Sequence, residues 1–265
     1  MNVDIIETGS QTLPNVSIVV PVLNEAENIS PLISEIRSVL ANKNFLGTFE
    51  IVYVDDGSDD STLEELKLES KVCPELVILR HQIVSGQSAA IRTGIINARA
   101  PIIVTIDGDG QNDPADIPIL LKVYLESKNR ENLLIIGHRA ERRDVWCKRI
   151  SSRIANAIRS RLLGDATPDT GCGLKVIHRA TFLAMPAFDH MHRFFPALMI
   201  GQGGRVISVL VNHRPRKRGR SNYGTFDRLF VGIFDLLGVL WLKHRALTTC
   251  YKTKKVVKKD NHSEL

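Results

Sequence analysis

The chain has 265 residues, of which 43% are hydrophobic and 24% charged, and these values predict one globular domain with a sizeable core, or one domain with an appendage. The formal net charge of +6 favours an anionic partner, which could be nucleic acid, anionic lipid or a phosphorylated substrate. The four cysteines lie far apart with no Cys-x-x-Cys pair, so they indicate neither a zinc site nor a disulfide framework, and we expect a reducing, cytoplasmic compartment.

Taken in chain order, the first fifteen residues are acidic and polar rather than basic and then apolar, which argues against a signal peptide. Apolar runs of strand length follow at residues 16–20, 51–54, 76–79, 102–106 and 133–136. Between them, helical periodicity predicts helices opened by Ser30-Pro31, begun near Ser61 with Glu64 in a capping box, spanning 87–99, and following Asp113-Pro114. This alternation predicts an α/β fold with a mostly parallel, twisted sheet flanked by helices.

Acidic and amide side chains follow three of these strands. Asn24-Glu25 comes after the first strand, Asp55-Asp56 after the second, and Asp107 with Asp109 after the fourth. A single acidic residue there is usually a turn or a helix cap, but three equivalent clusters are less easily explained in that way. Ligands bind beyond the carboxyl ends of parallel strands, and paired carboxylates suit Mg²⁺ or Mn²⁺ with positions left for phosphate oxygens.

Two common nucleotide-binding motifs are missing from the sequence. No Gly-x-Gly-x-x-Gly follows the first strand, and no Walker A sequence occurs. Dinucleotide-dependent enzymes and P-loop NTPases are therefore disfavoured.

Seven segments, in order between about residues 16 and 223, carry a resemblance to a known family. They cover residues 20–29, 54–58, 86–90, 107–111, 137–139, 169–174 and 214–221. Together they resemble family 2 glycosyltransferases, and within these the dolichyl- and polyprenyl-phosphate sugar synthases. The resemblance implies a GT-A-type fold and an inverting, metal-dependent transfer of a sugar from a UDP- or GDP-sugar to a polyprenyl phosphate.

The same resemblance implies roles for individual residues. The nucleotide-sugar pocket would be lined by Pro21, Leu23, Glu25, Val54, Asp56, Asp107 and Gly108. The metal, Mg²⁺ or Mn²⁺, would be bound by Asp109 directly, with Asp107 and Gln111 completing its shell. Donor or acceptor phosphates would be held by Arg139, by Lys148 or Arg149, and by Arg216.

Asp169 is the expected general base if the acceptor is a hydroxyl, which is a poor nucleophile at neutral pH. A lipid phosphate is already an anion at pH 7 and needs no base, so Asp169 would then only orient other groups. Two positions depart from the family pattern: Asn222 stands where this branch usually has Lys, and Gly110 where it has a bulky apolar residue. Both departures put the acceptor in doubt more than the activity.

The C-terminal third predicts where the enzyme works. Residues 229–242 are apolar except for Asp235, and basic clusters flank them. At about 1.5 Å per residue they are too short to cross a hydrocarbon core of about 30 Å. We therefore expect an N-terminal extension (1–15), a catalytic domain (16–224), an amphipathic helix on the anionic inner membrane surface (225–248) and a basic, disordered tail (249–265). The alternative for the helix is a core or dimer contact.

Other functions stay open at this point. The donor site could serve a transferase that acts on a hydroxyl of a glycan or glycolipid. A sugar nucleotidyltransferase needs a Gly-rich loop with an Arg after the first strand, which residues 21–25 do not offer. A basic nucleic-acid-binding protein would leave the acidic clusters unexplained, so no nucleic acid partner is expected. The sequence predicts neither the donor's base and sugar nor the oligomeric state.

Overall fold

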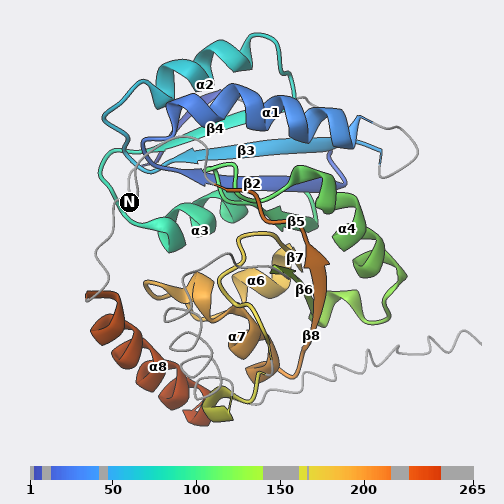
Figure 1. Cartoon of the computed structure of the whole chain (residues 1–265), viewed down its shortest axis with the longest axis vertical. Coiled ribbons are helices and arrows are strands. Elements are labelled where there is room, and N and C mark those ends of the chain that lie inside the picture. Colours follow the sequence, from blue (N-terminus) through green and yellow to red (C-terminus); the bar gives the residue numbers. More distant parts are fainter. Residues whose placement is uncertain are drawn as a thin grey trace, which may run out of the picture.

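The fold is an α/β arrangement around one mixed sheet, and the computed structural model describes residues 3–7, 13–41, 47–139, 161–165, 167–215 and 227–245 (Figure 1). Its strands are β1 (Val3–Glu7), β2 (Val16–Val22), β3 (Phe49–Asp55), β4 (Leu76–His81), β5 (Ile102–Thr105), β6 (Leu133–Arg139), β7 (Lys175–His178) and β8 (Arg205–Val211). Its helices are α1 (Ala26–Leu40), α2 (Thr62–Ser70), α3 (Gln87–Asn97), α4 (Ile117–Glu126), α6 (Arg179–Leu183), α7 (Phe195–Gly201) and α8 (Asp227–Arg245), with short 3-10 turns η1 (Pro114–Asp116), η2 (Arg130–Asn132) and η3 (Met191–Arg193).

Within these ranges the strands pair in the order β1-β4-β3-β2-β5-β7-β6-β8. The predicted α/β class is confirmed, with two antiparallel additions. β1, from the expected N-terminal extension, pairs antiparallel with β4 at one edge. β7 lies antiparallel between β5 and β6, so β5 and β6 run in the same direction. The carboxyl ends of β2, β3, β4, β5, β6 and β8 therefore meet at one edge of the sheet, together with the start of β7.

Helices cover both faces of the sheet, and the strands are apolar on both sides for that reason. On one face Ile18, Val20, Ile51 and Tyr53 pack with residues of α1, α2 and α4. On the other face Val19, Val52, Val54 and Leu79 pack with residues of α3, α6, α7 and α8. Figure 1 shows α1 and α2 on one side of β2 and β3, and α3 on the other.

One predicted helix start is wrong, and one predicted helix cap is not formed. α1 begins at Ala26 and not at Ser30-Pro31, so Pro31 lies inside the helix. α2 does begin after Ser61, but Ser61 makes no side-chain capping bond. Asp60 Oδ1 instead accepts the Thr62 main-chain N–H at 2.9 Å, because a short Asp side chain reaches an amide two residues on.

Candidate active site

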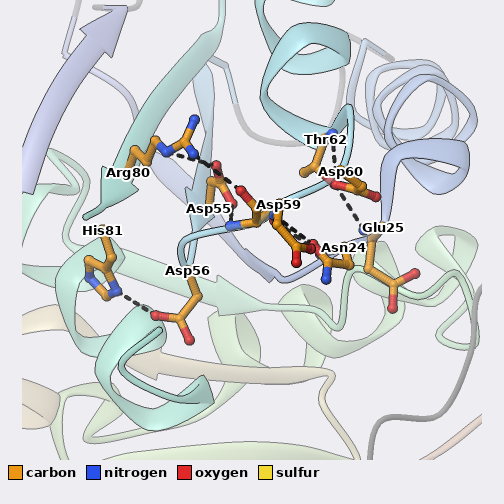
Figure 2. Close-up of polar contacts among 10 residues, drawn as sticks. Asn24, Glu25, Asp55, Asp56, Asp59, Asp60, Thr62, Arg80 and His81 are labelled. Carbon is orange, nitrogen blue, oxygen red and sulfur yellow. Dashed lines mark hydrogen bonds and ion pairs between the residues drawn. The ribbon is translucent and has the colours of Figure 1, made fainter. Parts of the chain in front are cut away.

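The loops after β2 and β3 are tied together by hydrogen bonds, as Figure 2 shows. Asn24, in the left-handed region with φ 57°, donates its main-chain N–H to Ser58 Oγ at 3.0 Å. Its side-chain Oδ1 accepts the Asp59 main-chain N–H at 3.0 Å. The Glu25 main-chain N–H is bound by Thr62 Oγ1 at 2.9 Å. The loop with Asn24 and Glu25 and the loop that follows Asp55 and Asp56 are therefore held together by hydrogen bonds.

Asp55 and Asp56, at the end of β3, have different tasks. Asp55 is fully buried, accepts the Ser58 N–H at 2.9 Å and lies 3.5 Å from the Arg80 guanidinium. Asp56 contacts His81 Nδ1 at 2.6 Å through Oδ1, which also accepts the Ser85 N–H at 2.9 Å. Asp56 Oδ2 accepts the Gly86 N–H at 2.7 Å. Because a carboxylate offers about four acceptor positions, these three contacts use most of the capacity of Asp56 and hold the loop before α3.

Asp107 and Asp109 lie just beyond β5, where the sequence predicts a metal site. The Asp107 main-chain N–H is held by Asn112 Oδ1 at 3.1 Å, and Asp107 Oδ1 accepts the Gln87 side-chain amide at 2.9 Å. Asp109 Oδ1 accepts the Gln111 main-chain N–H at 3.1 Å. The chain is thus bent so that two carboxylates stand together at the edge of the sheet.

The position of Asp107 requires a glycine on the neighbouring chain segment. A Cβ atom on Gly173, two residues before β7, would lie 2.2 to 2.3 Å from all three carboxyl atoms of Asp107. Thr105 Oγ1 fixes this segment by donating to the Gly173 carbonyl at 2.7 Å. Asp107 therefore rests on the bare main chain of Gly173.

Burial, and to a smaller extent the negative charge of Asp109, together raise the pKa of Asp107 from 3.8 to about 6. Lys175, Arg139 and the hydrogen bond from Gln87 oppose the rise. Two carboxylates that repel each other in this way are suited to a cation placed between them.

This pKa gives a stability prediction for the metal-free protein. Because the pKa of Asp107 is higher in the folded protein than the ordinary value of 3.8, the ionised carboxylate destabilises the fold. This destabilisation is complete above about pH 6, where Asp107 is ionised in the folded protein, and absent below about pH 4, where it is protonated in both states. Asp107→Asn should thus stabilise the protein in EDTA at pH 8 by about 1–3 kcal/mol, and the difference should vanish near pH 4. Urea unfolding at both pH values measures this, with the exposed Asp59→Asn as control. An equal gain at both pH values would contradict the assignment.

Two basic side chains, Arg139 and Lys175, lie close enough to Asp107 to lower its pKa. Arg139, the last residue of β6, binds Asp169 with Nε–Oδ2 at 2.6 Å and Nη2–Oδ1 at 2.8 Å, and both side chains are about nine-tenths buried. Lys175, the first residue of β7, is 4% exposed, donates to the Cys172 carbonyl and lies 5.6 Å from the centre of the Phe195 ring. Burial lowers the pKa of Lys175, while Cys172, Asp107 and Asp169 raise it.

The segment at η3 also reaches the site. His192 Nδ1 lies 2.7 Å from Ser88 Oγ, and the His192 main-chain N–H donates to the same oxygen at 3.2 Å. Burial first, and then Lys175, lowers the pKa of His192 to about 3, so this side chain is neutral at pH 7. Phe194 and Phe195 are core, being 4% and 1% exposed, and His192 faces α3.

The structure brings together most of the residues that the resemblance selected. Asp107 and Asp109 stand beside the Arg139–Asp169 pair, and Glu25 and Asp56 occupy the adjoining loops. Pro21 and Leu23 are partly exposed around the end of β2, and Gly108 packs on Val22 and the Pro21 carbonyl. The Val54 side chain is fully buried against α3, so only its main chain can face a ligand. Lys148, Arg149, Arg216 and Asn222 lie outside the described residues.

Four residues at the site received no role from the sequence: Gln87, Gly173, Lys175 and His192. Gln87 and Gly173 belong to segments 86–90 and 169–174, which carried the resemblance without an assigned chemistry. Lys175 and His192 follow no strand end and sit in no acidic cluster. Their contacts with residues about 70 to 100 positions away could not be read from local pattern.

The fold and the acidic edge of the sheet define the class of protein first. The chain is similar in structure to glucosyl-3-phosphoglycerate synthase from Mycobacterium tuberculosis, solved with Mn²⁺, UDP and glucosyl-3-phosphoglycerate, with a TM-score of 0.62 and 16% identity over 87% of this chain and 80% of that one. It is also similar to the mannosyltransferase PcManGT from Pyrobaculum calidifontis, solved with GDP-Man and Mn²⁺, with a TM-score of 0.60 and 18% identity over 89% and 65% of the two chains. The fold is the GT-A type.

Sequence similarity gives the family. Residues 17–183 match the model described as Glycosyl transferase family 2. Dodecaprenyl-phosphate galacturonate synthase of Rhizobium johnstonii is 36% identical over 85% of this chain and 66% of that protein. Undecaprenyl-phosphate 4-deoxy-4-formamido-L-arabinose transferase of Edwardsiella ictaluri is 32% identical over 87% of this chain and 69% of that protein. The chain belongs to glycosyltransferase family 2, as the motifs predicted, and it spans about two thirds of the length of these relatives.

Proposed function

We propose that this protein transfers a sugar from a UDP- or GDP-sugar to a polyprenyl phosphate at the cytoplasmic face of a membrane, with inversion at the anomeric carbon. The observation that carries the proposal is the Asp107–Asp109 pair at the edge where six strand ends meet, flanked by Arg139 and Lys175. The names of two relatives, a dodecaprenyl-phosphate and an undecaprenyl-phosphate transferase, support the acceptor class. Neighbours solved with UDP or with GDP-Man support a nucleotide-sugar donor.

The residues at the strand ends fit a hard divalent cation. Among the described residues no three Asp, Glu, His or Cys side chains form a metal cage, so the protein would supply only Asp107, Asp109 and the amide of Gln111. Such an incomplete oxygen shell suits Mg²⁺ or Mn²⁺ that is also bound to phosphates. When bound, the cation would neutralise charge on the departing nucleoside diphosphate. Neighbours solved with Mn²⁺ support this cofactor.

The state of Asp169 favours a phosphate acceptor over a hydroxyl. Both Asp169 oxygens are held by Arg139, at 2.6 and 2.8 Å, so Asp169 would have to leave this pair before it could take a proton from a hydroxyl. A lipid phosphate needs no proton removed, because its second pKa is about 6. The Arg139–Asp169 pair would then orient the guanidinium toward the phosphates. Transfer to a hydroxyl is the alternative function.

A screen for nucleoside diphosphate release tests the function. The full chain is incubated with UDP- and GDP-sugars and Mg²⁺ or Mn²⁺, with and without polyprenyl phosphate. We expect release that depends on both the metal and the lipid phosphate. Release with a water-soluble hydroxyl acceptor, and none with the lipid phosphate, would favour the alternative. No release with any donor would contradict the proposal.

Helix α8 supports a membrane-surface location. Within the described ranges, no helix has both the length and the apolar character needed to cross a membrane. The inner face of α8 packs on the domain through Leu236, Val239 and Leu240. Its outer face exposes Phe234 (72%) and Trp241 (63%), with Leu237 between them, and Lys243, His244 and Arg245 end the helix. An apolar stripe with basic residues suits the surface of an anionic bilayer.

Flotation with anionic liposomes tests this location. Replacing Phe234, Leu237 and Trp241 by Ser should weaken liposome binding by roughly 100-fold or more, because each side chain contributes about 1.5–3 kcal/mol on burial. Ile119→Ser, which removes an exposed apolar side chain from α4, should float like wild type. Wild-type protein that stays at the bottom even at low salt would show that α8 does not bind membranes.

A further inference from the structure

Three consecutive residues at the start of α3 each contact a different part of the site. The Gly86 main-chain N–H donates to Asp56 Oδ2 at 2.7 Å. The Gln87 side-chain amide donates to Asp107 Oδ1 at 2.9 Å. Ser88 Oγ contacts His192 Nδ1 at 2.7 Å. This segment, residues 86–88, thereby joins the loop after β3, the loop after β5 and the η3 turn.

Gln87 completes the restraint on Asp107. The Asp107 main chain is held by Asn112, and its carboxyl group lies against the Gly173 main chain, where no Cβ atom would fit. The amide of Gln87 fixes the remaining freedom by holding Oδ1. Among the described residues, Asp107 Oδ2 accepts no hydrogen bond. One oxygen of Asp107 is thus occupied by Gln87, and the other keeps its acceptor positions with respect to the described residues.

The position of Gln87 is itself braced from both sides. Gly86 has φ 90°, a conformation that side chains rarely adopt, and its N–H is bound by Asp56. On the other side, Ser88 Oγ accepts the His192 main-chain N–H at 3.2 Å and lies 2.7 Å from His192 Nδ1. Since Gln87 is exposed and contributes nothing to the core, its hydrogen bond to Asp107 is its evident task.

We propose that Gln87 is a positioning residue for the metal carboxylate Asp107. Residues 86–88 would fix the position of Asp107 relative to Asp56, because Gly86 binds Asp56 and Gln87 binds Asp107. The proposal rests on the proposed function, because it assumes that Asp107 and Asp109 bind a divalent cation. Partners that orient metal ligands in this way typically change metal affinity roughly 10- to 100-fold when removed. Gln87 would therefore act on the affinity for the cation and not on the fold.

Direct binding of Mn²⁺ tests the proposal without any turnover. Purified full chain is titrated with Mn²⁺, alone and with UDP or GDP, while free Mn²⁺ is followed by electron paramagnetic resonance. Gln87→Ala should bind Mn²⁺ roughly 10- to 100-fold more weakly than wild type, with an unchanged melting temperature. The matched control is Gln202→Ala, whose amide donates to the Ala184 carbonyl on the surface, and it should bind like wild type.

A second measurement separates positioning from a general structural effect. In the diphosphate-release assay, Gln87→Ala should need a higher Mn²⁺ concentration for half-maximal rate, and saturating Mn²⁺ should restore most of its kcat. If wild type and Gln87→Ala bind Mn²⁺ equally well, the role of Gln87 is overturned and the proposed function stands. If wild type binds no Mn²⁺ under any of these conditions, the metal site itself is overturned.

Discussion

Asp109→Ala is expected to abolish metal-dependent turnover. Asp109 is the carboxylate whose charge acts on Asp107 across the proposed metal site. Removing it leaves one carboxylate and the Gln111 amide, which is too little to hold a divalent cation against water. Because charge neutralisation by a metal contributes several kcal/mol to the transition state, the rate of diphosphate release should fall roughly 10³-fold or more.

The control for this variant is Asp59→Ala, which removes an exposed carboxylate from the neighbouring loop after β3. Its turnover should equal that of wild type. Asp109→Ala should also keep the wild-type fold, because the Asp109 side chain accepts a local hydrogen bond, from the Gln111 main-chain N–H two residues on. Full activity in Asp109→Ala with metal present would refute the metal assignment.

Gly173→Ala should disable the enzyme although it changes no polar group. The added methyl group would lie 2.2 to 2.3 Å from the Cγ, Oδ1 and Oδ2 atoms of Asp107, so either Asp107 or the main chain at 173 must move. Displacement of a reacting group by about 1 Å can cost roughly 100-fold in rate. We expect a loss of kcat/KM of at least this order, accompanied by weaker Mn²⁺ binding.

Gly201→Ala is the matched control, because a Cβ atom at Gly201 would meet nothing within 4 Å. This variant should keep wild-type turnover and wild-type Mn²⁺ affinity. Circular dichroism of Gly173→Ala would establish that the variant is folded. If folded Gly173→Ala worked as well as Gly201→Ala, the close contact between Gly173 and Asp107 would have no functional meaning.

The sequence predicted the strands well because their signal is local. Ile51 to Val54 and Leu133 to Ile136 are continuous apolar runs, and Val16 to Val20 is interrupted only by Ser17, as expected for strands covered on both faces. It missed β1 and β8, which lie at the two edges of the sheet, where pairing has one side only. It also missed β7, whose four residues include the buried Lys175. A charged residue breaks the apolar run that signals a central strand.

In the candidate site, too, some features could be predicted from the sequence and others could not. Asp107 and Asp109 could be predicted because both directly follow a strand, and strand ends meet at one edge. Asp56 was predicted as a nucleoside ligand, yet three of its acceptor positions are taken by His81, Ser85 and Gly86. Local pattern reports which group a residue offers to a ligand. It does not report which neighbours already use that group.

The sequence by itself therefore determined the fold class, the family and the carboxylates at the strand ends, since each depends on periodicity or on motifs of a few residues. Only the tertiary structure decided that Asp169 is paired with Arg139, that Asp107 lies on Gly173 and that Gln87 holds it. These contacts join residues 20 to 66 positions apart. Asp169 and Gly173 lie in the segment that leads into β7, which is antiparallel between β5 and β6, whereas Gln87 reaches Asp107 from the start of α3. Such long-range pairing is a property of the whole packed chain, and no local window contains it.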